Sequence, residues 1–326
     1  MSNCNKEVIP FSPVFSKKVE GSFTGGSISS NAGILLLREA DKAMGLSKRI
    51  NKRIEDKRHA SYVNHSQLSM HKQRIYALAL GYEDLNDQEQ LRHDECLKIA
   101  AERTNSLASA STLSRLENTI TASEIAALRW VFLDIFIAAH KQPPKEVILD
   151  FDATDDQIHG KQEQSYYNGY YEHNCFMPLF VFCGHHLLAA HLRASNIDGA
   201  KHAWAILALI VKHLREVWPE VEIIFRGDAG FCRDKMLNWC DRHHIKYVVG
   251  MAKNNRLIQA ISKRCAEAKE LFTARPETVR LFDRFEYAAD SWRYKRLMVA
   301  RIEHSHHGES VRFITTYLSG YCLIRI

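Results

Sequence analysis

The spacing of hydrophobic positions changes from helical to strand-like near residue 143. From about residue 29 to residue 140, apolar residues recur at helical intervals. The first helix is expected over the run Ile34, Leu35, Leu37 and Ala40, with a cap from Ser29, Ser30 or Asn31. Further helices are predicted at 111–128 and at 126–139, and the latter is apolar on most sides, which is typical of a buried helix. Pro143 and Pro144 end this helical part.

The segment after the two prolines predicts a mixed α/β sheet. Strands are expected at 146–154, 176–184, 187–195, 221–228 and 247–252. One helix, capped by Asp198, precedes the fourth strand, and a second over 233–243 precedes the fifth. Three strands followed by helix–strand units is the order of an RNase H-like core, although periodicity alone does not name that fold.

Beyond Lys253 the pattern predicts a β-rich insertion. A helix poor in apolar residues is expected over 257–271, followed by antiparallel strands at 285–292, 294–304 and 311–318. The expected organisation is therefore a mainly helical region (1–142), an α/β core (146–256) and the start of a β-rich insertion (257–326).

Composition permits nucleic-acid binding without requiring it. The net charge is +6, and 1–146 carries 20 basic against 17 acidic residues while the remainder carries 24 against 21. Each half is thus +3, so a DNA-binding face must be assembled by folding and not by a basic tail. No apolar run approaches the ~20 residues that a membrane span requires, and the N-terminus lacks the layout of a secretory signal. We expect a cytoplasmic protein without a membrane partner.

Cysteines and histidines give little indication of a metal site. None of the 8 cysteines forms a C-x-x-C pair, which disfavours a structural zinc site. Histidines cluster at 185–186, 243–244 and 304–307 without the spacing of a metalloprotease helix. We interpret them as surface or DNA-facing residues.

Acidic residues cluster at the end of the first predicted strand, in LDFDATDD. Asp150 and Asp152 are two residues apart, so on a strand they point to the same face. Asp155 and Asp156 follow near the strand end. Burying two carboxylates without a partner is costly, which favours a functional role. A strand end with solvated acids is the alternative, and this segment alone does not decide between them.

A second acid, Asp228, ends the predicted strand 221–228 within FRGDAGF. The carboxyl ends of strands in α/β sheets are favoured positions for ligands and catalysis. Gly227 and Gly230 on either side would let a substrate approach the backbone closely. Asp228 could equally serve only as the cap of the turn that follows. Taken together, however, two carboxylates on strands of one sheet could bind divalent cations and promote phosphodiester chemistry.

Several longer motifs resemble one family. DFDATDDQIHG, YYNGYYEHNCFMPLFVFCG, LRASNIDGA and WPEVEIIFRGDAGFCR, with GGSISSNAGILLLREAD and LASASTLSRLEN before them, resemble bacterial insertion-sequence DDE transposases of the 1380-type family. The resemblance covers nearly the whole chain. It implies an RNase H-like fold with Asp152 and Asp228 as catalytic, metal-binding acids, and Asp150 is kept as a reserve candidate. The implied metal is Mg²⁺, for which Mn²⁺ would substitute.

The resemblance also implies the partners. They are the terminal inverted repeats and target DNA, bound by a homodimer on paired ends in association with the nucleoid. The helical N-terminal region would recognise the repeats, and a helix-turn-helix around 109–118 is the candidate reader.

The sequence departs from this family after the predicted insertion. Family members continue into a helix with a Y-x-x-R-x-x-x-E pattern that supplies the third catalytic acid, and no such pattern follows Asp228. Glu286, Glu303 and Glu309 lie on or between the predicted insertion strands, in the wrong context. We therefore expect a truncated chain whose third catalytic Glu is absent, with impaired activity that the missing region would restore.

Two features after the fifth strand remain open. Trp292, expected in an insertion strand, could stack on an unpaired base, although packing within the insertion explains it more simply. The loop Lys253–Arg256 could contact phosphates or could be a solvated loop.

Three functions are consistent with these features. The first is a DDE transposase that cuts element ends and joins them to target DNA. The second is a non-catalytic DNA-binding remnant that inhibits its intact relative. The third is another RNase H-like nuclease, which the long helical region and the insertion disfavour.

Overall fold

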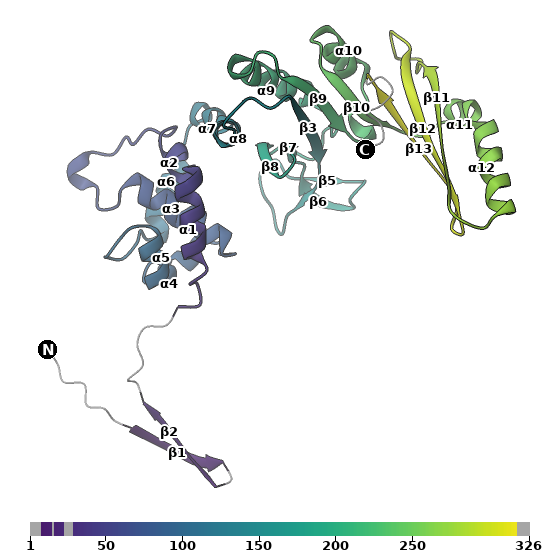
Figure 1. Ribbon diagram of the computed structural model, residues 1–326. Coiled ribbons are helices and arrows are strands. Elements are labelled where there is room, and N and C mark those ends of the chain that lie inside the picture. Colours follow the sequence, from purple (N-terminus) through teal and green to yellow (C-terminus); the bar gives the residue numbers. More distant parts are fainter. Residues whose placement is uncertain (1–7, 15, 23–28, 318–326) are drawn as a thin grey trace. The chain divides into compact units, whose positions relative to one another are not determined.

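A computed structural model describes residues 8–14, 16–22 and 29–317. By its internal contacts the chain divides into an N-terminal unit, Met1–Leu128, and a C-terminal unit, Arg129–Ile326. Each is described by itself (Figure 1). The expected division after residue 142 differs from this one, because helix α8 (Trp130–Ala139) contacts strand β8 (His186–His191) of the C-terminal unit. The predicted tail 319–326 lies outside the described residues.

The N-terminal unit combines a two-stranded hairpin with short helices. The hairpin, β1 (Val8–Val14) with β2 (Lys17–Ser22), was not predicted. The helices are α1 (Ile34–Met44), α2 (Leu46–Asn51), α3 (Gln67–Ala79), α4 (Gln88–Leu91), α5 (Glu95–Ala100), α6 (Ala110–Thr119) and α7 (Ala122–Leu128), with 3-10 turns η1 (Ala60–Tyr62) and η2 (Leu85–Asp87). A core that includes Ile34, Tyr76, Leu97 and Leu107 joins α1, α3 and α5.

Polar contacts inside this unit replace the expected cap of α1. The N-cap is Gly33 and has no side-chain bond, whereas the predicted cap Ser29 donates to Asp94 Oδ2 at 2.7 Å. Asp41 accepts hydrogen bonds from Ser47 Oγ at 2.6 Å and from Tyr76 Oη at 2.7 Å. Burial alone would raise the pKa of Asp41, but these bonds hold it below its usual value. Asp41 therefore ties α1 to both α2 and α3.

His71 of α3 gives the N-terminal unit a predictable pH dependence. Its side chain is 6% exposed, and neither ring nitrogen has a hydrogen-bond partner among the described residues. Burial lowers its pKa from 6.5 to about 4. The stability that comes from burying neutral His71 is thus fully present above pH 6.5 and is lost as the pH falls toward 4, by up to about 3 kcal/mol.

Urea unfolding of wild type and His71→Leu at pH 7 and at pH 4.5 measures this effect. We expect the free energy of unfolding to fall with pH in wild type and to fall much less in the variant. The exposed His59, replaced with Gln, is the matched control and should leave the wild-type pH dependence unchanged. An identical pH dependence in wild type and His71→Leu would contradict the assignment.

The C-terminal unit is built on an eight-stranded mixed sheet of order β11-β12-β13-β10-β9-β3-β7-β8. The first five strands of this sheet along the chain are β3 (Glu146–Ala153), β7 (Leu179–Cys183), β8, β9 (Glu222–Gly227) and β10 (Lys246–Met251). Strand β9 runs parallel to both β3 and β10, whereas β7 is antiparallel to β3 and to β8. The predicted mixed α/β architecture is confirmed.

Helices α8, α9 (Ala203–Val217) and α10 (Asp234–Arg242) share one apolar core with these strands. The apolar positions of α9 follow the predicted helical spacing, with Ile206, Leu207, Ile210 and Leu214 all buried. Asp198, however, does not cap α9. Its N-cap is His202, because residues 198–201 form a separate loop in which Asp198 Oδ1 accepts a hydrogen bond from Ala200 N at 2.8 Å.

The predicted β-rich insertion extends the central sheet. Strand β13 (Gly308–Thr316) pairs antiparallel with β10, and β12 (Arg296–Ser305) and β11 (Val279–Tyr287) continue from it. Helices α11 (Asn255–Ala260) and α12 (Ser262–Ala274) replace the single predicted helix, and both contribute to a core shared with these strands. Trp292 lies in the β11–β12 connection and not in a strand, and it packs against both cores of the unit.

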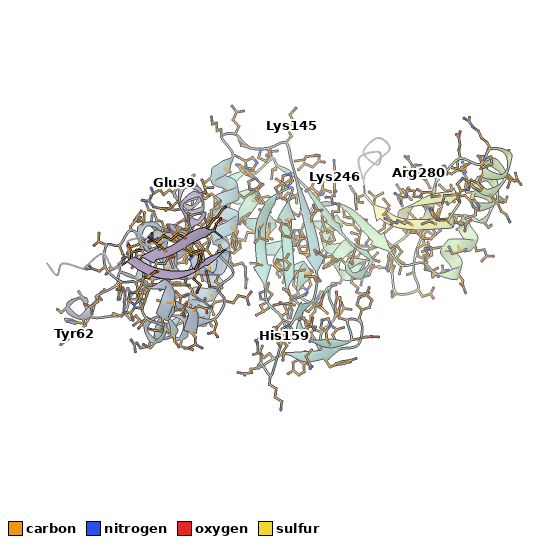
Figure 2. The ribbon with its side chains drawn as sticks, turned by 90° about the horizontal axis from the view of Figure 1, so that it is seen from below. Glu39, Tyr62, Lys145, His159, Lys246 and Arg280 are labelled. Atoms are coloured by element: carbon orange, nitrogen blue, oxygen red, sulfur yellow. The ribbon has the colours of Figure 1, made fainter. Side chains whose placement is uncertain are left out.

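A small three-stranded sheet, order β4-β6-β5, was also not predicted. Its strands are β4 (Asp156–Gln157), β5 (Tyr166–Asn168) and β6 (His173–Phe176). Figure 2 shows Lys145 and Lys246 at the edge of the main sheet where β3 and β10 begin, and His159 beyond the opposite edge. The small sheet therefore adjoins the edge at which the parallel strands end.

Candidate active site

Strand β3 alternates between a buried face and a face that carries acids. Val147, Leu149 and Phe151 are buried, whereas Asp150 is half-buried and Asp152 is exposed. The ring of Phe151 packs against that of Phe225 on β9, with centroids 5.1 Å apart. Because strand residues alternate in direction, this buried row fixes Asp150 and Asp152 on the opposite face.

Asp228 follows the last residue of β9 and caps the turn after it. Its Oδ1 accepts a hydrogen bond from Gly230 N at 2.8 Å, and it begins the 3-10 turn η3 (Ala229–Phe231). The carboxylate is nevertheless exposed. Capping and a role in catalysis, which the sequence left as alternatives, are thus compatible in one residue.

The register of β3 and β9 brings Asp152 and Asp228 to neighbouring positions. Phe151 pairs with Gly227 in parallel strands, so Asp152 and Asp228 are the next residues after this pair on the two adjacent strands. Adjacent strands are about 4.8 Å apart. Asp150 pairs with Arg226 one step earlier, and their side chains meet. Asp152 lies two residues after Asp150, and Asp228 lies two residues after Arg226. Because the backbone is extended at both places, Asp152 and Asp228 project from the same face.

Asp150, the reserve candidate, is engaged by Arg226. The guanidinium donates from Nε to one carboxylate oxygen of Asp150 and from its NH2 group to the other, the latter at 2.6 Å. This bidentate bond raises the pKa of Arg226 even though burial opposes it. With both oxygens occupied, Asp150 is a poorer metal ligand than Asp152.

Close packing of β10 against the Asp228 turn requires a glycine at position 250. A Cβ on Gly250 would lie 2.8 Å from Ala229 N and 3.1 Å from the Asp228 carbonyl carbon, both of them backbone atoms. Any side chain here would push the turn, and with it Asp228, away from β10. Sequence reasoning missed Gly250 because its importance depends on the register between distant strands.

We expect Gly250→Ala to lower the rate of any reaction that uses Asp228 by about 10-fold or more, because displacements of ~1 Å in an active site are costly. Gly33→Ala is the control, since a Cβ there meets no atom within 4 Å. Comparing DNA cleavage rates of the two folded variants tests this expectation. Equal rates would show that the turn tolerates the shift.

A second polar pair lies on the small sheet beside β3. His173 Nε2 and Asp155 Oδ2 are 2.7 Å apart, and both side chains are 26% exposed. Burial, and then the nearby carboxylates of Asp155 and Asp152, raise the pKa of Tyr171. Tyr171 therefore lies within electrostatic reach of Asp155 and Asp152.

The donor set suits a divalent cation that also binds substrate. Mg²⁺ typically takes one or two carboxylates together with substrate phosphates and water. Asp152 and Asp228 supply two exposed carboxylates on one face. The described residues contain no group of three or more His, Cys, Asp or Glu side chains able to hold a metal. Glu286, Glu303 and Glu309 lie on β11, β12 and β13, and Glu303 pairs with Arg280 at 2.8 Å.

The remaining sequence candidates have structural contacts. His243 stacks on Trp239, with ring centroids 4.3 Å apart, and His304 lies 5.0 Å from the ring of Phe272. Asn254 caps α11 through a 3.0 Å bond from Leu257 N. These contacts account for the positions of the side chains; whether any of the residues touches DNA stays a prediction.

Comparison with known proteins identifies the family. A family model described as "Transposase DDE domain group 1" matches residues 11–323. The chain belongs to this family. Membership in this transposase family agrees with two acids at adjacent strand ends. Among curated proteins, none matches the sequence.

Two solved structures of transposases are distant neighbours of this family member. One is the piggyBac transposase in a synaptic complex with hairpin DNA, at a TM-score of 0.38 and 13% identity, covering 90% of this chain and 62% of that one. The chain thus spans less than two thirds of the piggyBac chain. The other is the Mos1 transposase in a paired-end complex with the left transposon end. Its TM-score is 0.23 and its sequence identity is 13%, and the match covers 70% of this chain and 69% of that one. Both TM-scores lie below 0.5.

None of the helices in the described part of the chain is long and apolar enough to cross a membrane.

Proposed function

We propose that this chain is a metal-dependent DNA transposase whose reaction centre contains Asp152 and Asp228. The observation that carries the proposal is the register of β3 with β9, which sets both carboxylates on one face at adjacent strand ends. Transposase family membership supplies the reaction class, phosphodiester cleavage followed by strand transfer. The sequence motifs support the narrower assignment to bacterial insertion sequences of the 1380-type family.

We infer an RNase H-like core for the C-terminal unit. In support, its five core strands have the spatial order β8-β7-β3-β9-β10, with β9 parallel to both neighbours and β7 antiparallel to both of its own. This order places the first strand of the core, β3, beside the fourth, β9. The carboxyl ends of these two strands, where the acids lie, meet at one edge of the sheet.

Asp152 and Asp228 would hold the divalent metal, Mg²⁺ with Mn²⁺ as a substitute. When bound, such a metal activates a water or a 3′-hydroxyl and neutralises charge on the phosphodiester. The chain's own residues orient the two ligands. Arg226 neutralises Asp150 beside them, and the Gly230 amide fixes one oxygen of Asp228. Gly250 allows the Asp228 turn to lie against β10.

Recognition of element ends is proposed for the N-terminal unit. Helix α6 coincides with the segment 109–118 expected to read DNA. Its Arg115 lines a cavity of about 630 Å³, which Arg58 and Arg92 also line. Burial and then the charges of Arg103, Arg92 and Arg58 lower the pKa of His65 in this cavity. Burial is the largest cause of that depression, and the arginine charges that add to it are groups that suit phosphate contacts. We propose a homodimer on paired ends, acting on the nucleoid in the cytoplasm.

A non-catalytic DNA-binding protein is the second candidate. The observation that favours it is that no third carboxylate joins Asp152 and Asp228 within the described residues. Such a chain would keep end recognition and compete with an intact relative for element ends.

Cleavage of a duplex that carries the element's end, taken from the DNA flanking the gene, tests the proposal. We expect strand cleavage at the end in Mg²⁺ or Mn²⁺ and none in EDTA. Binding of the end without cleavage in either metal would favour the second candidate. Metal-dependent cutting of unrelated duplexes at the same rate, without preference for the end, would instead indicate a general nuclease.

A further inference from the structure

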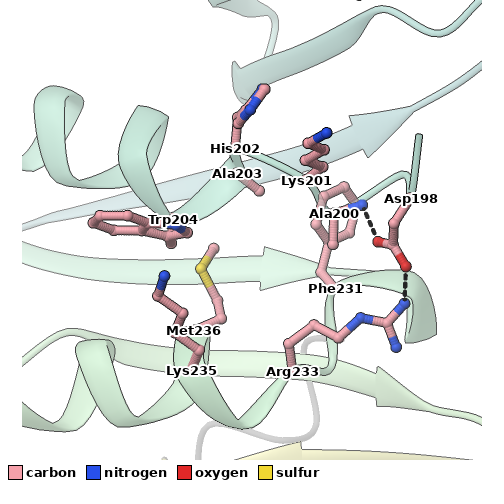
Figure 3. Close-up of a pocket in the computed structure, with 10 residues that line it drawn as sticks. All are labelled: Asp198, Ala200, Lys201, His202, Ala203, Trp204, Phe231, Arg233, Lys235 and Met236. Atoms are coloured by element: carbon pink, nitrogen blue, oxygen red, sulfur yellow. Dashed lines mark hydrogen bonds and ion pairs between the residues drawn. The ribbon is translucent and has the colours of Figure 1, made fainter. Parts of the chain in front are cut away.

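A cavity of about 350 Å³ lies between the start of α9 and the segment that links η3 to α10. Figure 3 shows Lys235 and Met236 reaching toward the Trp204 ring, while Arg233 and Asp198 meet on the other side. The volume falls within the range of ~300–1,000 Å³ that is usual for small-molecule sites.

The cavity borders the edge of the sheet that carries the two acids. Its lining residue Phe231 comes three positions after Asp228, and its ring lies against the space beside Gly227, where a Cβ would meet it at 3.0 Å. The same ring is 6.1 Å from that of Phe151, which precedes Asp152. The cavity therefore lies near the strand ends that carry both acids, on the face of the sheet where Phe151 is buried.

The loop that forms the opposite wall is held rigidly. Arg193 is 5% exposed and donates hydrogen bonds to the carbonyl oxygens of Met177, Gly199 and Lys201, at 2.9, 2.9 and 2.7 Å. A Cβ on Gly199 would lie 3.6 Å from Cβ of Ala153, the residue after Asp152. Arg193 thus ties this loop to the Met177 backbone, and Gly199 packs beside the end of β3.

The lining combines an aromatic surface with an excess of positive charge. Trp204 is 39% exposed, whereas Phe231 and Met236 are buried beneath it. Lys235 Nζ lies 4.5 Å from the centroid of the Trp204 ring. Lys201 and Arg233 also line the cavity, where Asp198 is the one acid among the lining residues and pairs with Arg233 at 2.6 Å.

We propose that this cavity binds one unpaired nucleotide of the DNA strand at the reaction centre. The base lies against Trp204 and Met236, and the adjoining phosphates contact Lys201 and Lys235. Stacking of bases on aromatic side chains within a basic groove is how proteins hold single-stranded DNA without reading its sequence. A phosphate of paired DNA would need the charges but would leave the apolar lining unused. The proposal rests on the proposed function, since it names part of the substrate of that same site.

Fluorescence of 2-aminopurine tests the proposal without requiring cleavage. The probe is a duplex with a single unpaired 2-aminopurine at one end, titrated with the full chain in Ca²⁺, and a fully paired duplex serves as the reference. We expect quenching of the unpaired probe in wild type. Trp204→Ala should abolish this quenching and weaken binding of the unpaired probe by about 10-fold relative to the paired duplex. Trp204→Phe should retain most of both.

Leu209→Ala is the matched control, because Leu209 lies on the same helix with 37% exposure and does not line the cavity. It should behave as wild type. Thermal melting of each variant identifies any that fail to fold, in which case Trp204→Phe and Lys235→Gln decide the matter. Unchanged quenching in Trp204→Ala, or equal weakening for paired and unpaired DNA, overturns the proposal and points to backbone phosphate binding alone.

The two proposals can fail independently. Quenching that depends on Trp204 in a chain that never cleaves DNA would support the nucleotide site and refute the catalytic function. Normal cleavage with quenching that does not depend on Trp204 would support the catalytic function and refute the nucleotide site.

Discussion

Replacing Asp228 with asparagine is expected to lower the rate of metal-dependent DNA cleavage by at least about 100-fold and to leave the fold intact. Changes to groups that only orient a metal ligand already cost ~10–100-fold, and removing the charge of a ligand should cost more. The fold should persist because an asparagine side-chain oxygen can still accept the bond from Gly230 N. Asp152→Asn should have the same effect, since the two carboxylates share one face.

A second substitution at the same position separates the two roles of Asp228. Asp228→Ala removes both the metal ligand and the cap, so it should lose cleavage equally and also lose stability, by about 1 kcal/mol. Asp156→Asn is the matched control, because Asp156 is an exposed aspartate on β4 outside the pair. If Asp228→Asn cleaves DNA at the wild-type rate with magnesium present, Asp228 is not part of the reaction centre.

Replacing Arg296 with methionine is expected to destabilise the C-terminal unit by about 3 kcal/mol. Arg296 is 5% exposed and donates hydrogen bonds to Asp241 Oδ2 at 2.5 Å, Asn238 Oδ1 at 2.6 Å and Tyr247 Oη at 2.7 Å. It thereby ties the start of β12 to α10 and β10. Removing one partner of a buried ion pair costs ~3–5 kcal/mol. We expect the low end because the Asp241 side chain is 31% exposed.

Chemical denaturation measures this loss, with Arg280→Met as the matched control. Arg280 on β11 pairs with Glu303 on β12, but the Arg280 side chain is 54% exposed. Exposed ion pairs contribute ~0–1 kcal/mol, so the control should change stability little. Similar losses in both variants would mean that the Arg296 contacts contribute no more than a surface pair.

Elements with a regular apolar pattern could be predicted from the sequence. Strands β3, β9 and β10 have continuous or alternating apolar runs, and their predicted ranges differ from the observed ones by at most one residue at each end. The residues themselves indicated only two acidic segments on strands of one sheet, and the family resemblance selected Asp152 and Asp228 from them. The register of β3 and β9 brings these two residues to neighbouring positions, and their chemical role stays a prediction.

Contacts between distant segments could not be predicted. Nothing in residues 311–318 indicates that β13 pairs with β10 and extends the central sheet, because an apolar pattern specifies a face and not a neighbour. The small sheet was missed since β4 and β5 are only two and three residues long. Arg226 could have been suspected from its spacing, two residues before Asp228, but its partner Asp150 emerges only from the strand register.

The ion pair between Arg226 and Asp150 sets the net charge of the face of β3 and β9 that carries the candidate acids. With Asp150 neutralised, Asp152 and Asp228 together carry two negative charges, which matches the charge of one divalent cation. Without the guanidinium, three carboxylates would stand on neighbouring strand positions, and their added negative charge would attract a further cation. A single arginine on the parallel strand thus limits how many cations this edge of the sheet attracts.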